Sequence, residues 1–322
     1  LVHRIASQVD EKGKIDAFTK WFEKNQGVLN GIEVYNFREM GNGFRATSSI
    51  QENDLVLKVP NHLILTIENM KDHPSQIIRW FYQYFHSISS EQAIIMWLLY
   101  EKNLGILSSF YEYIQILPEK VPSLIYFSDD EVQELQDSWF AEETLAYQRE
   151  VQTNYQQFLE ALRQMLVEKS NDISPIVKQV FLPPARSSSA ADGFSVETLQ
   201  AKFTFDDYLW ALSILNSRAL RFHGEIHLIP MADIFNYEKH HQPRQQDNGN
   251  FFLQHHRLDP KTRSISIYAD RNIEAVGEQL FEDYGDNTNQ IYLTYHGFVP
   301  HFLNPFHCVN FHFQHYWKYL LK

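Results

Sequence analysis

The spacing of apolar residues changes twice along this chain, and these changes constrain its fold more than any single motif. Alternating patterns typical of strands cover residues 32–37 and 55–59. From Thr66 the apolar spacing is helical, and it remains so into a helix that starts after Thr204. Strand patterns then return at 250–254, 264–268, 278–283 and 308–313. This order predicts an α+β fold, in which one β-rich domain is interrupted by a large helical insert.

The same patterns divide the chain into consecutive segments. We predict an N-terminal helical segment at 1–31, with an amphipathic helix over 14–26. A first β-rich part at 32–65, a helical insert at 66–203, a second β-rich part at 204–305 and the start of a C-terminal segment at 306–322 follow. Within the insert, a long helix is expected at about 142–169, and the Pro-, Ser- and Ala-rich residues 182–195 are expected to form a mobile surface loop.

Local signals mark several element boundaries. Ser128 and Glu131 have the spacing of a capping box, and Thr204 with its following acidic residues predicts another helix start. That second helix is expected to end over 216–220. Gly41-Asn42-Gly43 predicts a tight turn between two strands.

Composition excludes several classes of function. The formal net charge of −12 and the pI near 5.6 argue against nucleic-acid binding and favour a basic protein or peptide substrate. Cys308 is the only cysteine, so a disulfide framework and a cysteine zinc cluster are both excluded, as expected for the cytosol or nucleus. No window is apolar enough for a membrane span. The start at Leu1 rather than Met leaves organelle targeting open, and we expect a monomer.

The stretch from Leu228 to Phe298 contains the polar residues that most need an explanation. Asp233 and Asn236 lie in an apolar run, and burying an unpaired carboxylate or amide costs roughly 1–3 kcal/mol. Later in the stretch, Tyr284 ends a strand pattern and precedes Gly285 and an Asp- and Asn-rich turn that can cap a helix. We therefore expect a ligand or the backbone to pair with these side chains.

Four short motifs, in a fixed order, carry a resemblance to a known family. They are Gly41-Asn42-Gly43-Phe44-Arg45-Ala46, Asn216-Ser217-Arg218, Asp233-Ile234-Phe235-Asn236 and Tyr284-Gly285. Over roughly residues 32–299 the chain resembles the SET-domain protein methyltransferases. More narrowly, it is similar to the branch typified by the Rubisco large-subunit lysine methyltransferase, which also contains the actin-histidine methyltransferase. The resemblance implies a β-rich SET domain with a pseudoknot-like C-terminal crossing.

The resemblance also implies a cofactor and a set of site residues. S-adenosylmethionine would be the methyl donor and S-adenosylhomocysteine the product, with no metal. The cofactor would contact Asn42, Gly43, Phe44, Arg218, Asp233, Asn236, Tyr237, Tyr284, Gly297 and Phe298. Arg218 would meet the cofactor carboxylate, which a guanidinium can bind with two hydrogen bonds. Tyr284 would be the catalytic residue, which steers the methyl group and stabilises the polarised transition state.

Departures from the family pattern bear on the target residue. His296 stands where lysine-modifying members commonly have Tyr, and Tyr237 stands where the family usually has His. Leu220 and Ala232 occupy positions where the actin-histidine enzyme has Asn and Trp. Because the features associated with histidine are absent, the resemblance favours lysine, with Leu220, Ala232 and His296 along the substrate channel. The family has a C-terminal substrate-docking domain, and we expect it to be missing from this chain, whose sequence stops at Lys322.

Other interpretations of these residues compete with the resemblance. Arg218 fits a helix C-terminus without a ligand, Asn236 fits a turn and Tyr284 fits a strand in the core. Adjacent histidines at 240–241 and 255–256 raise the possibility of a metal site, but in a strand each pair offers only one ligand to a shared ion. At the level of function, the alternatives to a lysine methyltransferase are a protein-histidine methyltransferase and a catalytically silent SET-fold binding module.

Overall fold

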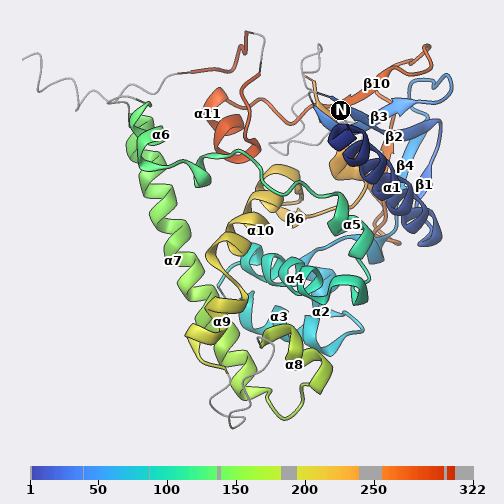
Figure 1. Cartoon of the computed structure of the whole chain (residues 1–322). Helices are drawn as coiled ribbons and strands as arrows, with labels where there is room; N and C mark the ends of the chain where they lie inside the picture. Colours follow the sequence, from blue (N-terminus) through green and yellow to red (C-terminus); the bar gives the residue numbers. More distant parts are fainter. Residues whose placement is uncertain are drawn as a thin grey trace, which may run out of the picture.

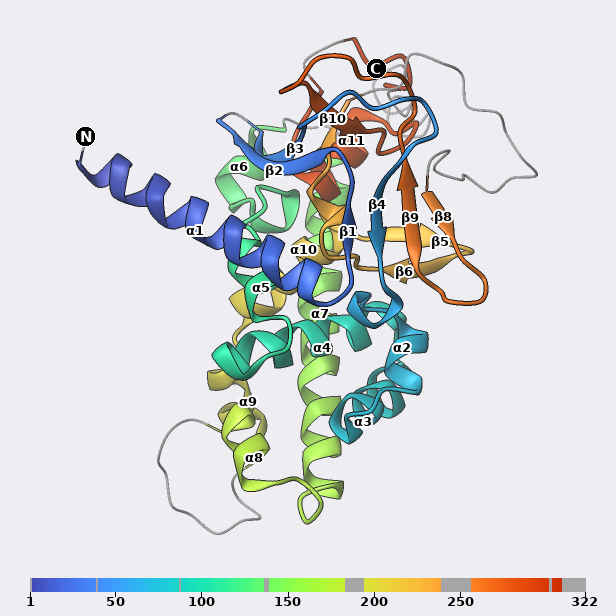
Figure 2. The same ribbon diagram turned by 90° about the vertical axis from the view of Figure 1, so that its right-hand side faces the viewer.

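A computed structural model describes residues 2–38, 40–86, 88–135, 139–182, 194–238, 256–300 and 303–308. Strands gather at one end of the molecule, and the helices α3, α8 and α9 lie at the other (Figures 1 and 2). The helices are α1 (Val2–Lys24), α2 (Ile67–Lys71), α3 (Gln76–Phe85), α4 (Ser90–Leu104), α5 (Tyr111–Ile116), α6 (Asp129–Gln133), α7 (Trp139–Glu168), α8 (Pro175–Phe181), α9 (Val196–Lys202), α10 (Phe205–Arg218) and α11 (Asn289–Ile291). The strands are β1 (Val28–Leu29), β2 (Ile32–Phe37), β3 (Gly41–Ala46), β4 (Leu55–Val59), β5 (Leu220–Phe222), β6 (Glu225–His227), β7 (Asn236–Tyr237), β8 (His256–Leu258), β9 (Ile265–Tyr268) and β10 (Gln279–Glu282).

Pairing of the strands brings together motifs that lie far apart in the sequence. One sheet has the order β1-β4-β9-β8, a second has the order β2-β3-β10-β7, and β5 pairs with β6. In the second sheet, β10 runs antiparallel to β3, with Leu280 opposite Phe44, and parallel to β7, with Phe281 opposite Asn236. The glycine-rich motif and the Asn236 motif therefore lie on either side of the strand that leads to Tyr284.

Helices form the other half of the core. Helix α4 is buried along nearly all of its length, as its apolar sequence predicts, and α3 and α10 pack against it. The capping box predicted at Ser128 is present, and the helix start predicted at Thr204 is also closed by a capping box, with Asp207. Among the described residues, no helix is long and apolar enough to cross a membrane.

Several sequence predictions need correction. Helix α1 is longer than the expected 14–26, since it begins at Val2 and ends at Lys24. Gly41-Asn42-Gly43 is not a turn but the start of β3, paired with β2 from Phe37 opposite Gly41 onwards. Glycine permits a turn without requiring one, and here Gly43 is needed for packing inside the sheet.

The helix after Thr204 ends at Arg218, and the β5–β6 hairpin that follows was not predicted. Short strands of this kind carry too few residues for a clear alternating pattern. The strand patterns at 250–254 and 308–313 and the loop predicted at 182–195 fall mainly outside the described residues, as do His240, His241 and His255.

Candidate functional site

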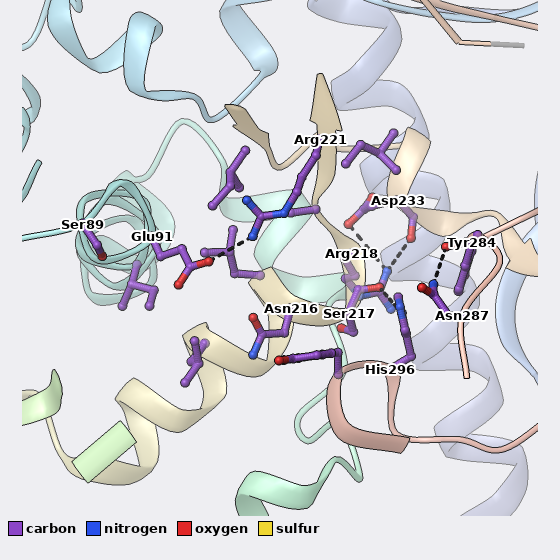
Figure 3. A pocket seen from close by; sticks show the side chains of 18 of the residues that line it. Ser89, Glu91, Asn216, Ser217, Arg218, Arg221, Asp233, Tyr284, Asn287 and His296 are labelled. Atoms are coloured by element: carbon purple, nitrogen blue, oxygen red, sulfur yellow. Dashed lines mark hydrogen bonds and ion pairs between the residues drawn. The ribbon is translucent and has the colours of Figure 1, made fainter. Parts of the chain in front are cut away.

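Two cavities meet at the junction between α10, the segment 231–237 and the segment that follows β10. The larger cavity has a volume of about 1490 Å³ and the smaller one, drawn in Figure 3, about 720 Å³. A common wall separates them, and its residues line both: Ser217, Arg218, Asp233, Phe235, Tyr284 and His296. A ligand in one cavity can therefore face a ligand in the other across this wall.

Arg218 and Asp233 form a buried ion pair within the wall. Arg218, the last residue of α10, donates from Nη1 to the Asp233 carbonyl at 2.8 Å, and the same nitrogen lies 3.5 Å from Asp233 Oδ2. Tyr113 donates its hydroxyl to Oδ2 at 2.7 Å. Burial raises the pKa of Asp233, and the Arg218 charge opposes that rise. Because the other carboxylate oxygen, Oδ1, is buried without a partner among the described residues, the pair leaves an acceptor available.

Asn236 presents an unpaired donor beside Gly43. Its Nδ2 is buried and has no hydrogen-bond partner within the described part of the chain. A Cβ added at Gly43 would lie 2.5 Å from that nitrogen, so only glycine leaves room for the amide. Asn236 lines the larger cavity. A buried amide without a partner costs roughly 1–3 kcal/mol, which an acceptor on a ligand would recover.

Tyr284 and His296 are stacked on each other, and each directs its hydrogen to a backbone carbonyl within the wall. Their ring centroids are 5.0 Å apart, and the Tyr284 hydroxyl donates to the Phe235 carbonyl at 2.6 Å. His296 Nδ1 lies 3.3 Å from the Ser217 carbonyl, which can only accept, so Nδ1 carries the proton. That carbonyl belongs to the last turn of α10, where helical partners are missing.

Both rings are neutral, and each keeps a lone pair available. Burial lowers the pKa of His296 to about 4 and raises the pKa of Tyr284, to which Glu282 also contributes. His296 Nε2 makes no hydrogen bond to the residues that the structure describes. Tyr284 Oη and His296 Nε2 are therefore two acceptors on residues that line both cavities. Figure 3 shows the two side chains at the edge of the smaller cavity.

An aromatic group borders the larger cavity. The Tyr237 ring lies 5.3 Å from Tyr284, 5.0 Å from Tyr292 and 5.6 Å from Phe298, measured between centroids. Tyr292 donates its hydroxyl to the Gly285 carbonyl at 2.6 Å. Gly297 has φ of +76° and sits against the backbone of Pro122, so it positions the chain for Phe298. Such rings offer flat apolar faces to a planar ligand.

The structure brings most of the predicted site residues to these cavities. Those that line the larger cavity are Asn42, Arg218, Asp233, Asn236, Tyr237, Tyr284, Gly297 and Phe298. Leu220, Ala232 and His296 line the smaller cavity, where the substrate channel was expected. Gly43 and Phe44 line neither: Gly43 makes room for Asn236, and the fully buried Phe44 ring packs on Phe235, with centroids 4.5 Å apart. The Phe44 backbone is paired with β2 and β10 on its two sides.

Sequence reasoning missed several partners of these residues. Tyr113, the partner of Asp233, comes from α5 in the helical tract, and Tyr292 contacts Tyr237. Neither position had a local signal, since tyrosines are plentiful in this chain. Among the described residues, no group of three or more His, Cys, Asp and Glu could hold a metal ion.

Comparison with known proteins relates this site to a family. Residues 41–285 match the model of the SET domain. The chain is 25% identical over 288 residues to the actin-histidine N-methyltransferases of Homo sapiens and Mus musculus. Each of these matches covers 87% of this chain and 41% of the relative, so the chain spans less than half the length of the relatives it matches.

Solved structures share the fold. The SET domain of LSMT bound to lysine and AdoHcy superposes with a TM-score of 0.64 at 22% identity, covering 90% of this chain and 58% of that one. Rubisco LSMT bound to AdoMet gives a TM-score of 0.63 at 23% identity, covering 89% and 57%. The α+β SET fold predicted from the sequence is thereby confirmed.

Proposed function

We propose, from the premise that this chain belongs to the SET-domain family, that it transfers a methyl group from S-adenosylmethionine to a lysine side chain of a protein. The observation that carries the proposal is the common wall, with Tyr284 and His296 lining both cavities. The larger cavity would hold the cofactor and the smaller one the target side chain. Methyl transfer requires the two reactants to meet in line, and ligands on the two sides of a shared wall would face each other there.

The residues around the larger cavity fit S-adenosylmethionine. Asn236 Nδ2 is a buried donor in need of an acceptor, and Gly43 leaves the space that keeps it there. The Asp233 Oδ1 acceptor is equally unpaired among the described residues and suits a positively charged amino group. Arg218, whose side chain is 23% exposed, would meet the carboxylate. When bound, the cofactor would supply a methyl group on a positively charged sulfur. Solved structures with the same fold were bound to AdoMet and to AdoHcy.

The protein's contribution to the reaction would be alignment and control of protons. A lysine amine attacks only when neutral, and burial of that amine at the wall, away from water, would lower its pKa from about 10.4. The neutral amine then has two N–H donors and one lone pair. Tyr284 Oη and His296 Nε2 would each accept a hydrogen bond from one N–H of the amine. The lone pair of the amine nitrogen is then free to face the methyl group. Tyr284 would act as a fixed dipole rather than a base, since burial raises its pKa.

This pair of acceptors supports a lysine target over a histidine target. The attacking nitrogen of a neutral imidazole carries no hydrogen, so it has nothing to donate to either acceptor. The lone pairs of Tyr284 Oη and His296 Nε2 would instead repel the lone pair of that imidazole nitrogen. Leu220 and Ala232, which line the smaller cavity, also add no polar group to hold an imidazole.

Histidine methylation is the second candidate, because the relatives that match over 87% of this chain carry the name actin-histidine N-methyltransferase. A third candidate is a SET-fold module that binds a protein without modifying it. The activity assay below separates these candidates from lysine transfer.

Cofactor binding and target choice can be tested in one preparation. We expect S-adenosylmethionine to raise the melting temperature of the chain, and expect S-adenosylhomocysteine to form with lysine-centred peptide libraries. Matched histidine-centred libraries should give no product. Product with histidine alone would favour the second candidate, and binding without product on any library or extract would favour the module.

A further inference from the structure

The smaller cavity extends well beyond the wall that holds Tyr284 and His296. Its far end is built from the first turn of α4 and from α7, and Figure 3 shows Ser89 and Glu91 across the cavity from Tyr284 and Asp233. We call this region the α4–α7 end; it is lined by Glu91, Gln92, Tyr147, Glu150, Asn154 and Tyr295. A single target side chain at the wall leaves this end to another part of the substrate.

A buried acceptor at the α4–α7 end lacks a partner. Gln92 is only 3% exposed, and its Nε2 donates to the Asn154 carbonyl at 3.2 Å. Its Oε1 is buried and has no hydrogen-bond partner among the residues described. That bond fixes the donor side of the amide, so the orphaned oxygen is an acceptor on a residue that lines the cavity.

The charge at this end is negative and only partly balanced. Glu91 pairs with Arg221 at 3.0 Å. Glu150 on α7 and Asp286 on the segment after β10 line the same cavity, and neither forms an ion pair with a described residue. The cavity therefore has carboxylates to offer to a cation.

Aromatic rings complete the lining. Tyr147 and Tyr295 meet edge to face with centroids 6.0 Å apart, and the Tyr147 hydroxyl accepts from Asn216 at 3.0 Å. Burial raises the pKa of both tyrosines, and the charges of Glu91 and Glu150 raise them further. Both rings thus lie close to these carboxylates, and aromatic faces attract cations.

We propose that the α4–α7 end is a second substrate subsite, which binds an arginine side chain close in sequence to the target residue. The inference deepens the proposed function, on which it rests for the position of the target. An orphaned amide oxygen, unpaired carboxylates and tyrosine rings together match a guanidinium, which is planar, charged and has five N–H donors. A lysine ammonium would meet fewer of these groups at once.

Peptide binding tests the subsite without requiring turnover. The probes are fluorescein-labelled nonapeptides of Gly, Ser and Ala with a central lysine and one arginine moved through the flanking positions. Each has a twin in which citrulline, a neutral group of the same shape, replaces that arginine. Fluorescence anisotropy in the presence of S-adenosylhomocysteine gives the Kd of each peptide.

We expect the arginine peptide to bind about fivefold or more tightly than its citrulline twin at one or two positions only. Glu150→Gln should remove this preference, and Gln92→Met should reduce it. Glu142→Gln changes the same charge on an exposed part of α7 that does not line the cavity, so it should leave the preference intact.

Three results would overturn the proposed subsite. They are equal binding of the arginine and citrulline peptides at every position, an arginine preference that survives Glu150→Gln, and a failure of all the peptides to bind. Failure of the proposed function has a different signature. In that case the arginine preference persists in binding while no lysine peptide is methylated.

Discussion

The side chain of Asn236, at the start of β7, packs directly against Gly43 in β3, although the two residues are far apart in the sequence. The Asn236 amide fills the space above Gly43, where a Cβ would come within 2.5 Å of Nδ2 and 3.1 Å of the Phe37 ring. Strand β10 lies between β3 and β7 and fixes this contact. The glycine of the first motif thus places the one amide donor of the larger cavity that is both buried and unpaired among the described residues.

Replacing Gly43 by alanine should displace that amide. We expect Gly43→Ala to raise the Kd for S-adenosylmethionine by about tenfold, the effect of losing one well-made hydrogen bond to a charged ligand. Isothermal titration calorimetry measures it. The double variant Gly43→Ala/Asn236→Ala should bind no more weakly than Asn236→Ala alone, because both changes remove the same contact. Gly13→Ala is the control, since nothing lies within 4 Å of a Cβ there.

Loss of the Tyr284 hydroxyl should affect the reaction more than binding. Tyr284→Phe keeps the ring stacked on His296 and leaves the Phe235 carbonyl without its donor. We expect turnover to fall at least about tenfold while the Kd for the cofactor and the fold remain unchanged. Initial rates on a peptide that the parent chain methylates measure turnover, and isothermal titration calorimetry measures the Kd for the cofactor. Unchanged turnover would remove Tyr284 from the mechanism.

Arg218 should be required for stability as well as for the cofactor. Arg218→Met leaves the fully buried Asp233 carboxylate with Tyr113 as its remaining side-chain partner. Removing one member of a buried ion pair costs about 3–5 kcal/mol, and partial exposure of Arg218 places the expected loss nearer 2 kcal/mol. Urea denaturation measures the free energy of unfolding. If the double variant Arg218→Met/Asp233→Leu recovers the parent's free energy of unfolding, the loss is due to the unpaired Asp233 carboxylate. An Arg218→Met variant as stable as the parent would contradict the pairing.

Stability should decrease as the pH falls from about 6.5 towards 4, in part because of His296. Its pKa in the folded chain is lowered to about 4, whereas an unfolded histidine titrates near 6.5. In this window the unfolded state binds a proton that the folded state does not, so acid favours unfolding. His227 and His73, whose pKa values are also lowered by burial, contribute in the same direction.

His296→Phe isolates the contribution of that side chain. Urea denaturation at pH 7.5 and pH 5 should show a smaller loss of stability in the variant than in the parent. Equal losses of stability in the variant and the parent would mean that the pKa of His296 is not lowered by folding. His296 would then not offer a neutral Nε2 to the cavities at pH 5.

Local patterns in the sequence predicted many of the elements, and the resemblance to the SET-domain family supplied most of the site residues. Capping signals at Ser128 and Thr204 depend on residues within one turn, and both are present in the structure. The motif residues Arg218, Asn236 and Tyr284 line a common cavity. Parallel pairing of β7 with β10 brings Asn236 close to Tyr284, and Arg218 is joined to the same segment by its bonds to Asp233.

What the sequence could not supply were contacts decided by packing between remote segments. Gly43 suggested a turn, whereas its role is set by Asn236 from the far side of β10. Nothing near Tyr113 indicates its bond to Asp233, and the acceptor role of His296 follows only from the Ser217 carbonyl at the end of α10.

The central claim is that one wall joins a cofactor cavity to a channel for a lysine side chain. Its most direct test is tandem mass spectrometry of a protein extract incubated with the chain and S-adenosylmethionine carrying an isotopically labelled methyl group. The account predicts labelled methyl groups on lysine side chains, formed at least about tenfold more slowly when Tyr284→Phe replaces the parent chain. Labelled histidine in place of lysine, or lysine labelled at the parent rate by Tyr284→Phe, would contradict it.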